Sequence, residues 1–387
     1  MPVAMPLPSN DSAGKLGGPV TSPLVSVVVP VFRVPESFLR ANAISLRGQS
    51  FQNAEFLYVL DGPDPGALAL LQDIFRGDHR FAPVVLPENR GVSVARNTAL
   101  ERARGSFVTF VDADDLLPPG ALSAYARATE DAPDLVIGPT IGHLCSPKGR
   151  RALFSPPPSA VRDVQWARFH VWANSSVWAR LYGPAIRACR FDPGVRLLED
   201  ARFLWSHLAS LPSDARVVFL DVPVYSVVPR QGSASRSPVS AEDLCTYYDS
   251  LALLAQIPLP AGSGPETRRI RGLQLLLWAF VDARRAPPEA WSAAFPHACG
   301  FIETFLRFYS IPLLLRPLVH RRLSSPAALA SPLRIENILL WDVFRWQTRT
   351  ERAEPLLLSL CGIACSPLYH RLVSAFHPLP RLTKDSP

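Results

Sequence analysis

The sequence has few cysteines and no long uncharged apolar run. Its six cysteines are scattered along 387 residues without the paired spacing of a zinc site. We therefore expect free thiols in a reducing compartment. The longest uncharged apolar stretch, residues 355–369, is too short to span a bilayer and carries two prolines. The first residues also lack the charged and apolar segments of a secretory signal, so we expect a cytoplasmic protein.

Lysine-rich arms and zinc-finger spacing are also absent, which argues against nucleic acid as a partner. The formal net charge of +7 comes mainly from arginine. Such a charge suits an anionic membrane face or phosphorylated small molecules. Hydrophobic residues make up 48% of the chain and charged residues 19%, so most of it can bury a core. The length allows one large domain and a smaller region.

Composition changes along the chain predict four parts. Residues 1–22 are rich in proline, glycine and serine, which is typical of a disordered tail. Residues 23–236 form the expected α/β domain, and residues 237–378 form a mainly α-helical C-terminal region. The last part, residues 379–387, is a short and loose tail. The helical patterns of the third part cover residues 267–285, 301–323 and 333–349.

Strand and helix patterns alternate in the first half of the chain. Apolar runs predict strands at residues 25–30, 55–60, 83–86 and 107–111, and helical patterns cover residues 36–47, 66–76 and 91–104. We expect Gly105 to end the third helix in the C′ position. This alternation predicts a Rossmann-like, mostly parallel sheet with helices on both faces. Ligands bind such sheets beyond the carboxyl ends of the strands.

The rest of the α/β domain has a less regular pattern. A helix is expected at residues 121–129, a strand at 134–138, a helix at 201–208 and a strand at 216–220. Residues 145–164 are rich in proline and arginine, so we expect them to run over the surface as a loop.

Carboxylates follow two of the predicted strands. Asp61 ends the second strand, and Asp112, Asp114 and Asp115 end the fourth. Anionic groups held this close repel one another, and a cation would offset that repulsion. Hard oxygen ligands of this kind suit Mg²⁺ or Mn²⁺, which in turn hold phosphates. A solvated acidic turn is the simpler alternative, but two acidic strand ends make it less attractive.

Five motifs in order resemble glycosyltransferase family 2, whose members have the GT-A fold. The resemblance covers roughly residues 24–236 of this chain. The motifs are Val25-Ser-Val-Val-Val-Pro30, Leu60-Asp61-Gly62, Asn89-Arg-Gly-Val-Ser-Val-Ala-Arg-Asn97, Val111-Asp-Ala-Asp-Asp-Leu116 and Leu198-Glu199-Asp200. Each motif alone is weak, but the five in this order are specific.

The resemblance implies an inverting transfer of a sugar from a nucleotide-diphosphate sugar to an acceptor hydroxyl. It assigns a divalent metal, Mn²⁺ or Mg²⁺, to Asp114 and Asp112. The implied donor-binding residues are Pro30, Val31, Asp61, Arg96, Asp112 and Arg230. Within this set, Asp61 would meet the base, Asp112 the ribose or sugar, and Arg96 the diphosphate. The alternative for Arg96 is an arginine on the helix surface.

The resemblance also assigns the general base that takes the proton of the acceptor hydroxyl. This residue is Asp200, with Glu199 beside it as the second implied catalytic residue. The alternative for both residues is an N-terminal cap of the helix that follows.

Departures from the family pattern concern the nucleotide more than the reaction. The first turn reads Pro30-Val31-Phe32-Arg33 where an aromatic residue and asparagine are usual, and Asp61 stands alone where two aspartates are common. Pro63 also replaces the usual small polar residue. We expect a UDP-sugar as donor and a glycan or lipid-linked acceptor in cell-surface polysaccharide synthesis.

Two other functions stay open at this point. A nucleotidyltransferase that makes the activated sugar usually has a glycine-rich basic loop after the first strand, and residues 31–34 are not one. A non-catalytic glycan-binding relative would not need Asp112, Asp114 and Asp200.

Basic residues beside an apolar segment predict a peripheral contact with the inner face of the plasma membrane. The segment comprises residues 311–322 and includes three arginines and a histidine. A packed helix with a basic end explains the same pattern.

Overall fold

The fold is taken from a computed structural model, which describes residues 22–142, 151–154, 176–229, 240–260 and 290–309, with scattered positions between 262 and 279. Several predictions lie outside these residues. They concern the N-terminal tail before residue 22, Arg230, the basic segment 311–322, the helix at 333–349 and the C-terminal tail.

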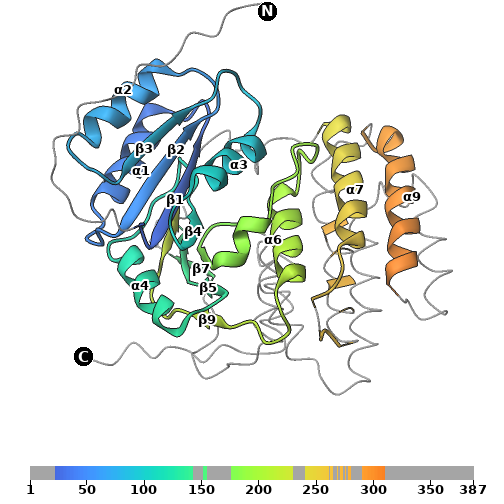
Figure 1. The fold of residues 1–387 in the computed structure, drawn as a ribbon. Coiled ribbons are helices and arrows are strands. Elements are labelled where there is room, and N and C mark those ends of the chain that lie inside the picture. The colour runs from blue at the N-terminus through green and yellow to red at the C-terminus, as the bar shows by residue number, and fades with distance from the viewer. Residues whose placement is uncertain are drawn as a thin grey trace, which may run out of the picture.

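The predicted mostly parallel sheet is confirmed. It has seven strands in the order β3-β2-β1-β4-β8-β5-β9 (Figure 1). Their bounds are β1 Val25–Val31, β2 Ala54–Leu60, β3 Phe81–Val85, β4 Phe107–Phe110, β5 Leu135–Ile137, β8 Arg180–Tyr182 and β9 Val217–Phe219. β8 runs antiparallel to β4 and β5, and the other pairs are parallel.

A second sheet has three strands in the order β10-β6-β7. It comprises β6 (Thr140–Gly142), β7 (Arg151–Phe154) and β10 (Tyr225–Val227). β7 corrects the prediction of a loop throughout residues 145–164. It forms a strand because β6, nearby in the sequence, supplies backbone partners for it in an antiparallel pair.

Helices cover both faces of the large sheet, as predicted. The helices are α1 Glu36–Arg47, α2 Pro65–Ile74, α3 Val92–Arg102, α4 Ala121–Ala128, α6 Glu199–Ser210, α7 Ala241–Gln256 and α9 Ala290–Phe308. Alternate residues of β1 divide between two hydrophobic clusters, since successive strand side chains point to opposite faces. Val27 and Val29 belong to the cluster that contains residues of α1, α2 and α4. Val28 belongs to the cluster that contains residues of α3 and α6.

Helix ends differ from the predictions by one or two residues, and two of these differences bear on the site. α3 ends at Arg102, and the next residue, Ala103, is already extended, so Gly105 is not its C′ residue. A Cβ atom on Gly105 would lie 2.5 Å from the backbone nitrogen of Ser26, so this glycine permits close approach of β1. α6 begins at Glu199 rather than at residue 201, which puts both acidic residues in its first turn.

α7 packs against α9 and α6 beside the sheet (Figure 1). Its start is fixed by a capping box, in which Ser240 accepts from the Asp243 N–H and the Asp243 side chain accepts from the Ser240 N–H. The predicted boundary between residues 236 and 237 falls outside the described residues, so the division into domains stays a prediction. Within the described part of the chain, no helix combines the length and apolar character needed to cross a membrane.

Candidate active site

The carboxyl end of β1 is where the order of strands changes direction. β2 pairs with one edge of β1 and β4 with the other, while β3 continues beyond β2. Such a switch point leaves a crevice outside the carboxyl ends of parallel strands. Asp61 follows β2 and Asp112 follows the β4 run, so both predicted acidic turns stand beside this point.

Asp61 holds the loop that starts α3. Its side chain is buried, and its two carboxylate oxygens accept from the Arg90 and Gly91 N–H groups at 2.7 and 2.8 Å. Gly91, the N-cap of α3, has φ +90°, a conformation that favours glycine. Asp61 therefore fixes where α3 begins. Its predicted contact with a nucleotide base stays a prediction.

Arg96 joins carboxylates that are far apart in the sequence. It lies on α3, and only 3% of the residue is exposed. Its Nη1 donates to Asp200 Oδ1 at 2.6 Å, and its Nη2 donates to Asp112 Oδ1 at 3.1 Å. Glu199 Oε1 lies 3.8 Å from Nη1. This burial rules out the alternative of a surface arginine.

The segment before α6 is tied to α3 so that Asp200 reaches Arg96. Asn97 donates to the Phe191 carbonyl and accepts from the Phe191 N–H, both at 2.8 Å. The Arg96 guanidinium also lies over the Phe191 ring, 5.1 Å from its centroid. Leu198 has φ +61°, an unusual backbone conformation directly before the acidic pair.

Asp200 makes contacts outside its own helix. Oδ1 accepts from Arg96 on α3, and Oδ2 accepts from the Val177 N–H at 3.4 Å. Both acidic residues do lie in the first turn of α6, where the helix dipole favours them. The N-cap of α6 is Leu198, however, and no side chain makes a capping hydrogen bond there, so neither acidic residue is the cap. The contact with Arg96 instead joins Asp200 to α3 and, through Arg96, to Asp112.

Negative charge exceeds positive charge around Arg96. Burial raises the pKa of Asp112 to about 6, and repulsion from Asp200 and Asp114 adds to the shift, which Arg96 only partly offsets. Burial and then repulsion from Asp200 raise the pKa of Glu199 to about 7. Clustered carboxylates with raised pKa values are typical of functional sites.

Asp112 and Asp114 suit a divalent cation with few protein ligands. Both are half-buried, whereas Ala113 between them is buried, and repulsion from Asp114 contributes to the raised pKa of Asp112, so the two carboxylates lie near each other. Among the described residues, no group of three or more histidine, cysteine or acidic side chains is arranged to hold a metal. A cation here would take its remaining ligands from phosphate and water, which Mg²⁺ readily does.

Asp115 has a different environment from its acidic neighbours. Its carboxylate is buried and accepts from the Tyr225 hydroxyl at 2.8 Å and from the Val228 N–H at 2.7 Å. The same hydroxyl accepts from the Asp112 N–H at 3.1 Å. Burial and then repulsion from Asp112 raise the pKa of Asp115 to about 7. Asp115 and Tyr225 thus attach the acidic turn that follows β4 to β10.

Sequence reasoning missed Tyr225 as a site residue. The only available signal was a tyrosine in an apolar strand, since a buried hydroxyl needs a partner. Of the other predicted residues, Val31 is buried in the core and Pro30 is half-buried. Only the backbone of Val31 faces a site residue, because its carbonyl accepts from the Asp61 N–H at 2.9 Å. Arg230 lies outside the described residues.

The fold and this acidic edge define a GT-A-like α/β protein. Residues 26–171 match the family model described as glycosyl transferase family 2. This match shows the family for residues 26–171 of the chain.

Curated relatives match parts of the chain. It is 35% identical over 116 residues to the putative glycosyltransferase EpsH of Bacillus subtilis, which is 30% of this chain and 33% of EpsH. It is 40% identical over 93 residues to the putative teichuronic acid biosynthesis glycosyltransferase TuaG of the same organism, which is 24% of this chain and 36% of TuaG. The chain thus spans about a third of the length of each of these relatives.

A solved structure shares the fold over most of the chain. The S. aureus protein TarS, residues 1–349, in complex with UDP, aligns with a TM-score of 0.60 and 20% identity. The alignment covers 80% of this chain and 89% of that one. The likeness at this identity shows the fold alone.

Proposed function

We propose that the protein is an inverting glycosyltransferase that moves a sugar from a nucleotide-diphosphate sugar to an acceptor hydroxyl. The observation that carries this proposal is the bridge through Arg96. It brings Asp112, which follows β4, to Asp200, which lies 88 residues further along the chain at the start of α6. A donor-binding carboxylate and a general base have to share one cleft in such a reaction.

The residues of this chain have distinct parts in the proposed step. Asp200 accepts the proton of the acceptor hydroxyl while that oxygen attacks the anomeric carbon of the donor sugar. The new carbon–oxygen bond forms as the bond to the diphosphate breaks, and the nucleoside diphosphate leaves with the bonding electrons. Attack from the side opposite the leaving group inverts the anomeric carbon. Arg96 orients Asp200, and Glu199 lies beside it.

Asp112 and Asp114 are the residues that would hold Mn²⁺ or Mg²⁺. A bound cation would neutralise negative charge on the departing diphosphate. Asp112 is also held by Arg96 and, through its backbone, by Tyr225, so its position is fixed from two sides.

The biological setting is proposed from similarity. TuaG carries a name from teichuronic acid biosynthesis, and TarS has been solved with UDP and with UDP-GlcNAc. We therefore propose a UDP-sugar donor, a glycan or lipid-linked acceptor, and a part in polysaccharide synthesis. A cytoplasmic location with contact at the inner face of the plasma membrane goes with that proposal.

A donor screen tests the proposal directly. The full-length protein is incubated with Mn²⁺ and a panel of UDP-, GDP- and dTDP-sugars, and binding is scored by thermal shift. Donors that bind are then incubated with acceptor glycans, and the anomeric configuration of the product is read by NMR. We expect a UDP-sugar to bind and an α-linked donor to give a β-linked product. Retention of configuration, or no binding of any nucleotide sugar, would overturn the proposal.

A further inference from the structure

We infer that Asn42, Ser45 and Gln49 are positioning residues that hold the acidic segment, residues 112–118, in the geometry needed to bind a cation and a nucleotide diphosphate. Asn42 and Ser45 lie on α1 and Gln49 follows its C-cap Gly48, and we call the three residues the α1 polar stripe. The inference rests on the proposed function. It adds residues that contact neither the donor nor the metal but act through the backbone that carries Asp112 and Asp114.

Asn42 contacts the acidic segment where the carboxylates lie. Its side chain is fully buried, and its Nδ2 donates to the Asp112 carbonyl at 3.1 Å and to the Asp115 carbonyl at 2.7 Å. Its Oδ1 accepts from the Tyr58 hydroxyl at 2.8 Å, which fixes the orientation of the amide. One side chain thus spans the turn by binding the carbonyl groups of its first and last residues, Asp112 and Asp115, with Asp114 between them.

Ser45 on α1 and Gln49 just after its end continue the contact with the acidic segment. Ser45 Oγ accepts from the Leu117 N–H at 3.1 Å. Gln49 is 2% exposed, and its Nε2 donates to the Leu117 and Pro118 carbonyls at 3.3 and 2.9 Å. Its Oε1 accepts from the Leu122 N–H at 3.2 Å, at the start of α4.

The spacing of these residues matches the course of the segment. Positions 42 and 45 are three residues apart on α1, so they lie on one helix face, and Gln49 follows directly after the C-cap Gly48. Successive residues of the stripe meet successive residues of the segment, which therefore runs alongside α1 in the same direction. Buried polar groups on a helix face that packs against a core are costly unless they are paired. Here each of them pairs with the acidic segment or its neighbours.

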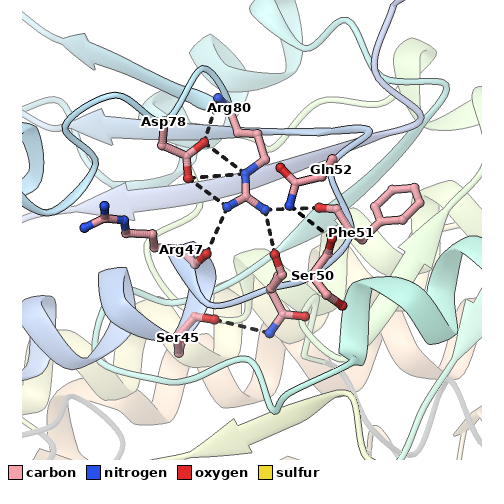
Figure 2. A network of polar contacts seen from close by, with 8 residues as sticks. Ser45, Arg47, Ser50, Phe51, Gln52, Asp78 and Arg80 are labelled. Carbon is pink, nitrogen blue, oxygen red and sulfur yellow. Dashed lines mark hydrogen bonds and ion pairs between the residues drawn. The ribbon is translucent and has the colours of Figure 1, made fainter.

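A second network fixes the end of α1 and the residues that follow it, including Gln49. The buried Arg80 guanidinium donates to the carbonyls of Arg47, Gln49 and Phe51 at 2.8–3.1 Å. Arg80 also pairs with Asp78, with Nη2 2.7 Å from Oδ2. Figure 2 shows the Arg80 guanidinium between Asp78 and the chain around Arg47, Ser50 and Phe51. The backbone of Gln49 is therefore held while its side chain holds the acidic segment.

The experiment compares Gln49→Ala with Gln52→Ala in the full-length protein. Gln52 is a matched control, because it is an exposed glutamine whose amide donates only to the nearby Ser50 carbonyl at 3.0 Å. Binding of Mn²⁺ in the presence of UDP is measured by EPR, and hydrogen exchange of residues 112–122 is measured by mass spectrometry. Ser45→Ala and Ser45→Thr form a second pair, in which the threonine keeps the hydroxyl.

We expect Gln49→Ala to weaken Mn²⁺–UDP binding about tenfold, as removal of an outer-shell contact to a metal site does, and to speed exchange at residues 112–122. Gln52→Ala should change neither the Mn²⁺–UDP affinity nor the exchange rate. Ser45→Ala should weaken the binding, and Ser45→Thr should keep it close to that of the wild type. A folded Gln49→Ala protein with wild-type Mn²⁺–UDP affinity would overturn the inference and leave the proposed function standing. If the wild type binds no Mn²⁺–UDP, the proposed UDP donor with its metal fails, and unchanged exchange in Gln49→Ala would then overturn the positioning role as well.

Discussion

The two ends of the central sheet each bury an arginine, and the two arginines have different partners. At the amino end, Arg80 faces one carboxylate, Asp78, and three backbone carbonyls. At the carboxyl end, Arg96 faces three carboxylates, those of Asp112, Glu199 and Asp200. Positive charge balances negative charge around Arg80, whereas negative charge is in excess around Arg96.

The pKa values of the carboxylates follow this difference. Burial alone would raise the pKa of Asp78, but its hydrogen bonds with Arg80 and the Arg80 charge outweigh burial and lower it. Near Arg96, burial raises the pKa of Asp112 to about 6 and that of Glu199 to about 7, and one guanidinium only partly offsets it. The network around Arg80, in which positive and negative charges balance, is structural. The network around Arg96 has excess negative charge, so it can accept a cation and exchange a proton.

The largest expected effect is on the transfer rate, which should depend on the carboxyl end of the sheet and not on the amino end. Asp200→Asn removes the proposed base and should lower the transfer rate about 10³-fold, with donor affinity retained. Asp78→Asn, the matched change at the amino end, should leave the transfer rate of the folded protein unchanged. Steady-state kinetics with the donor found by the screen measure both. Unchanged turnover in Asp200→Asn would refute its role as base.

Removing either arginine should cost stability, and a cation should offset more of the loss in one variant than in the other. Arg80→Met and Arg96→Met each leave buried carboxylate charge without its cation, so we expect a loss of about 3–5 kcal/mol in the free energy of unfolding. Millimolar Mn²⁺ should raise the Tm of Arg96→Met more than that of Arg80→Met, because removal of Arg96 leaves the carboxylates around the proposed cation site without their positive partner, whereas Arg80→Met leaves that site as it is in the wild type. Equal Mn²⁺ shifts in the two variants would show that the excess charge around Arg96 does not contribute to a cation site.

Substitution of the proposed cation ligand Asp114 should have a smaller effect, on the Mn²⁺ requirement. Asp114→Asn keeps the shape of the side chain but removes its charge, so the Mn²⁺ concentration for half-maximal transfer should rise about tenfold. Asp64→Asn is the control, since Asp64 caps α2 by accepting from the Ala67 N–H at 2.9 Å. Excess chelator should abolish transfer by the wild type, and Mn²⁺ added back should restore it. Transfer that persists in chelator would contradict the metal assignment.

The smallest effect is an opposite dependence of stability on pH at the two ends. The folded-state pKa of Glu199 is raised from 4.5 to about 7. The contribution of Glu199 to the free energy of unfolding is therefore present at low pH and is lost as pH rises from about 4.5 to 7. Its side chain is 21% exposed, so we expect this loss to lower the free energy of unfolding by about 1 kcal/mol after solvent screening. Asp78 has the opposite sign, because its pKa is lowered and its contribution is lost as pH falls below its ordinary pKa.

Urea unfolding at pH 5 and pH 8 checks this difference. Glu199→Gln should be more stable than the wild type at pH 8 and nearly equal to it at pH 5. Asp78→Asn should be less stable than the wild type at pH 8. The same sign for both variants at pH 8 would contradict the contrast between the two ends.

Local patterns were enough to predict the frame of the site. Buried parallel strands are continuous apolar runs, so β1, β2 and β4 were visible in the sequence within one residue at most of their ends. The acidic residues after β2 and β4 were predicted to stand at strand ends, and they do. The helix pattern of α1 was also correct, with Leu39, Ala43 and Leu46 buried as expected.

Polar contacts of the same helix were not predictable from its sequence. Asn42 on α1 and Gln49 just after its end are also buried, although a hydrophobic pattern assigns polar residues to the outside. Their partners lie about 70 residues away, so only the folded chain shows why they are inside. The same holds for Tyr225, which reaches Asp115 across 110 residues.

By itself, the sequence determined the alternation of strands and helices, the carboxylates at the strand ends and the family motifs, because each depends on residues close together in the chain. Tertiary structure alone decided that Arg96 is buried between Asp112 and Asp200, that Asp115 braces the acidic segment, and that α1 holds that segment from its other side. The physical reason is that a buried polar group takes whichever partner packing brings to it, and strand order, not the local pattern, determines that partner.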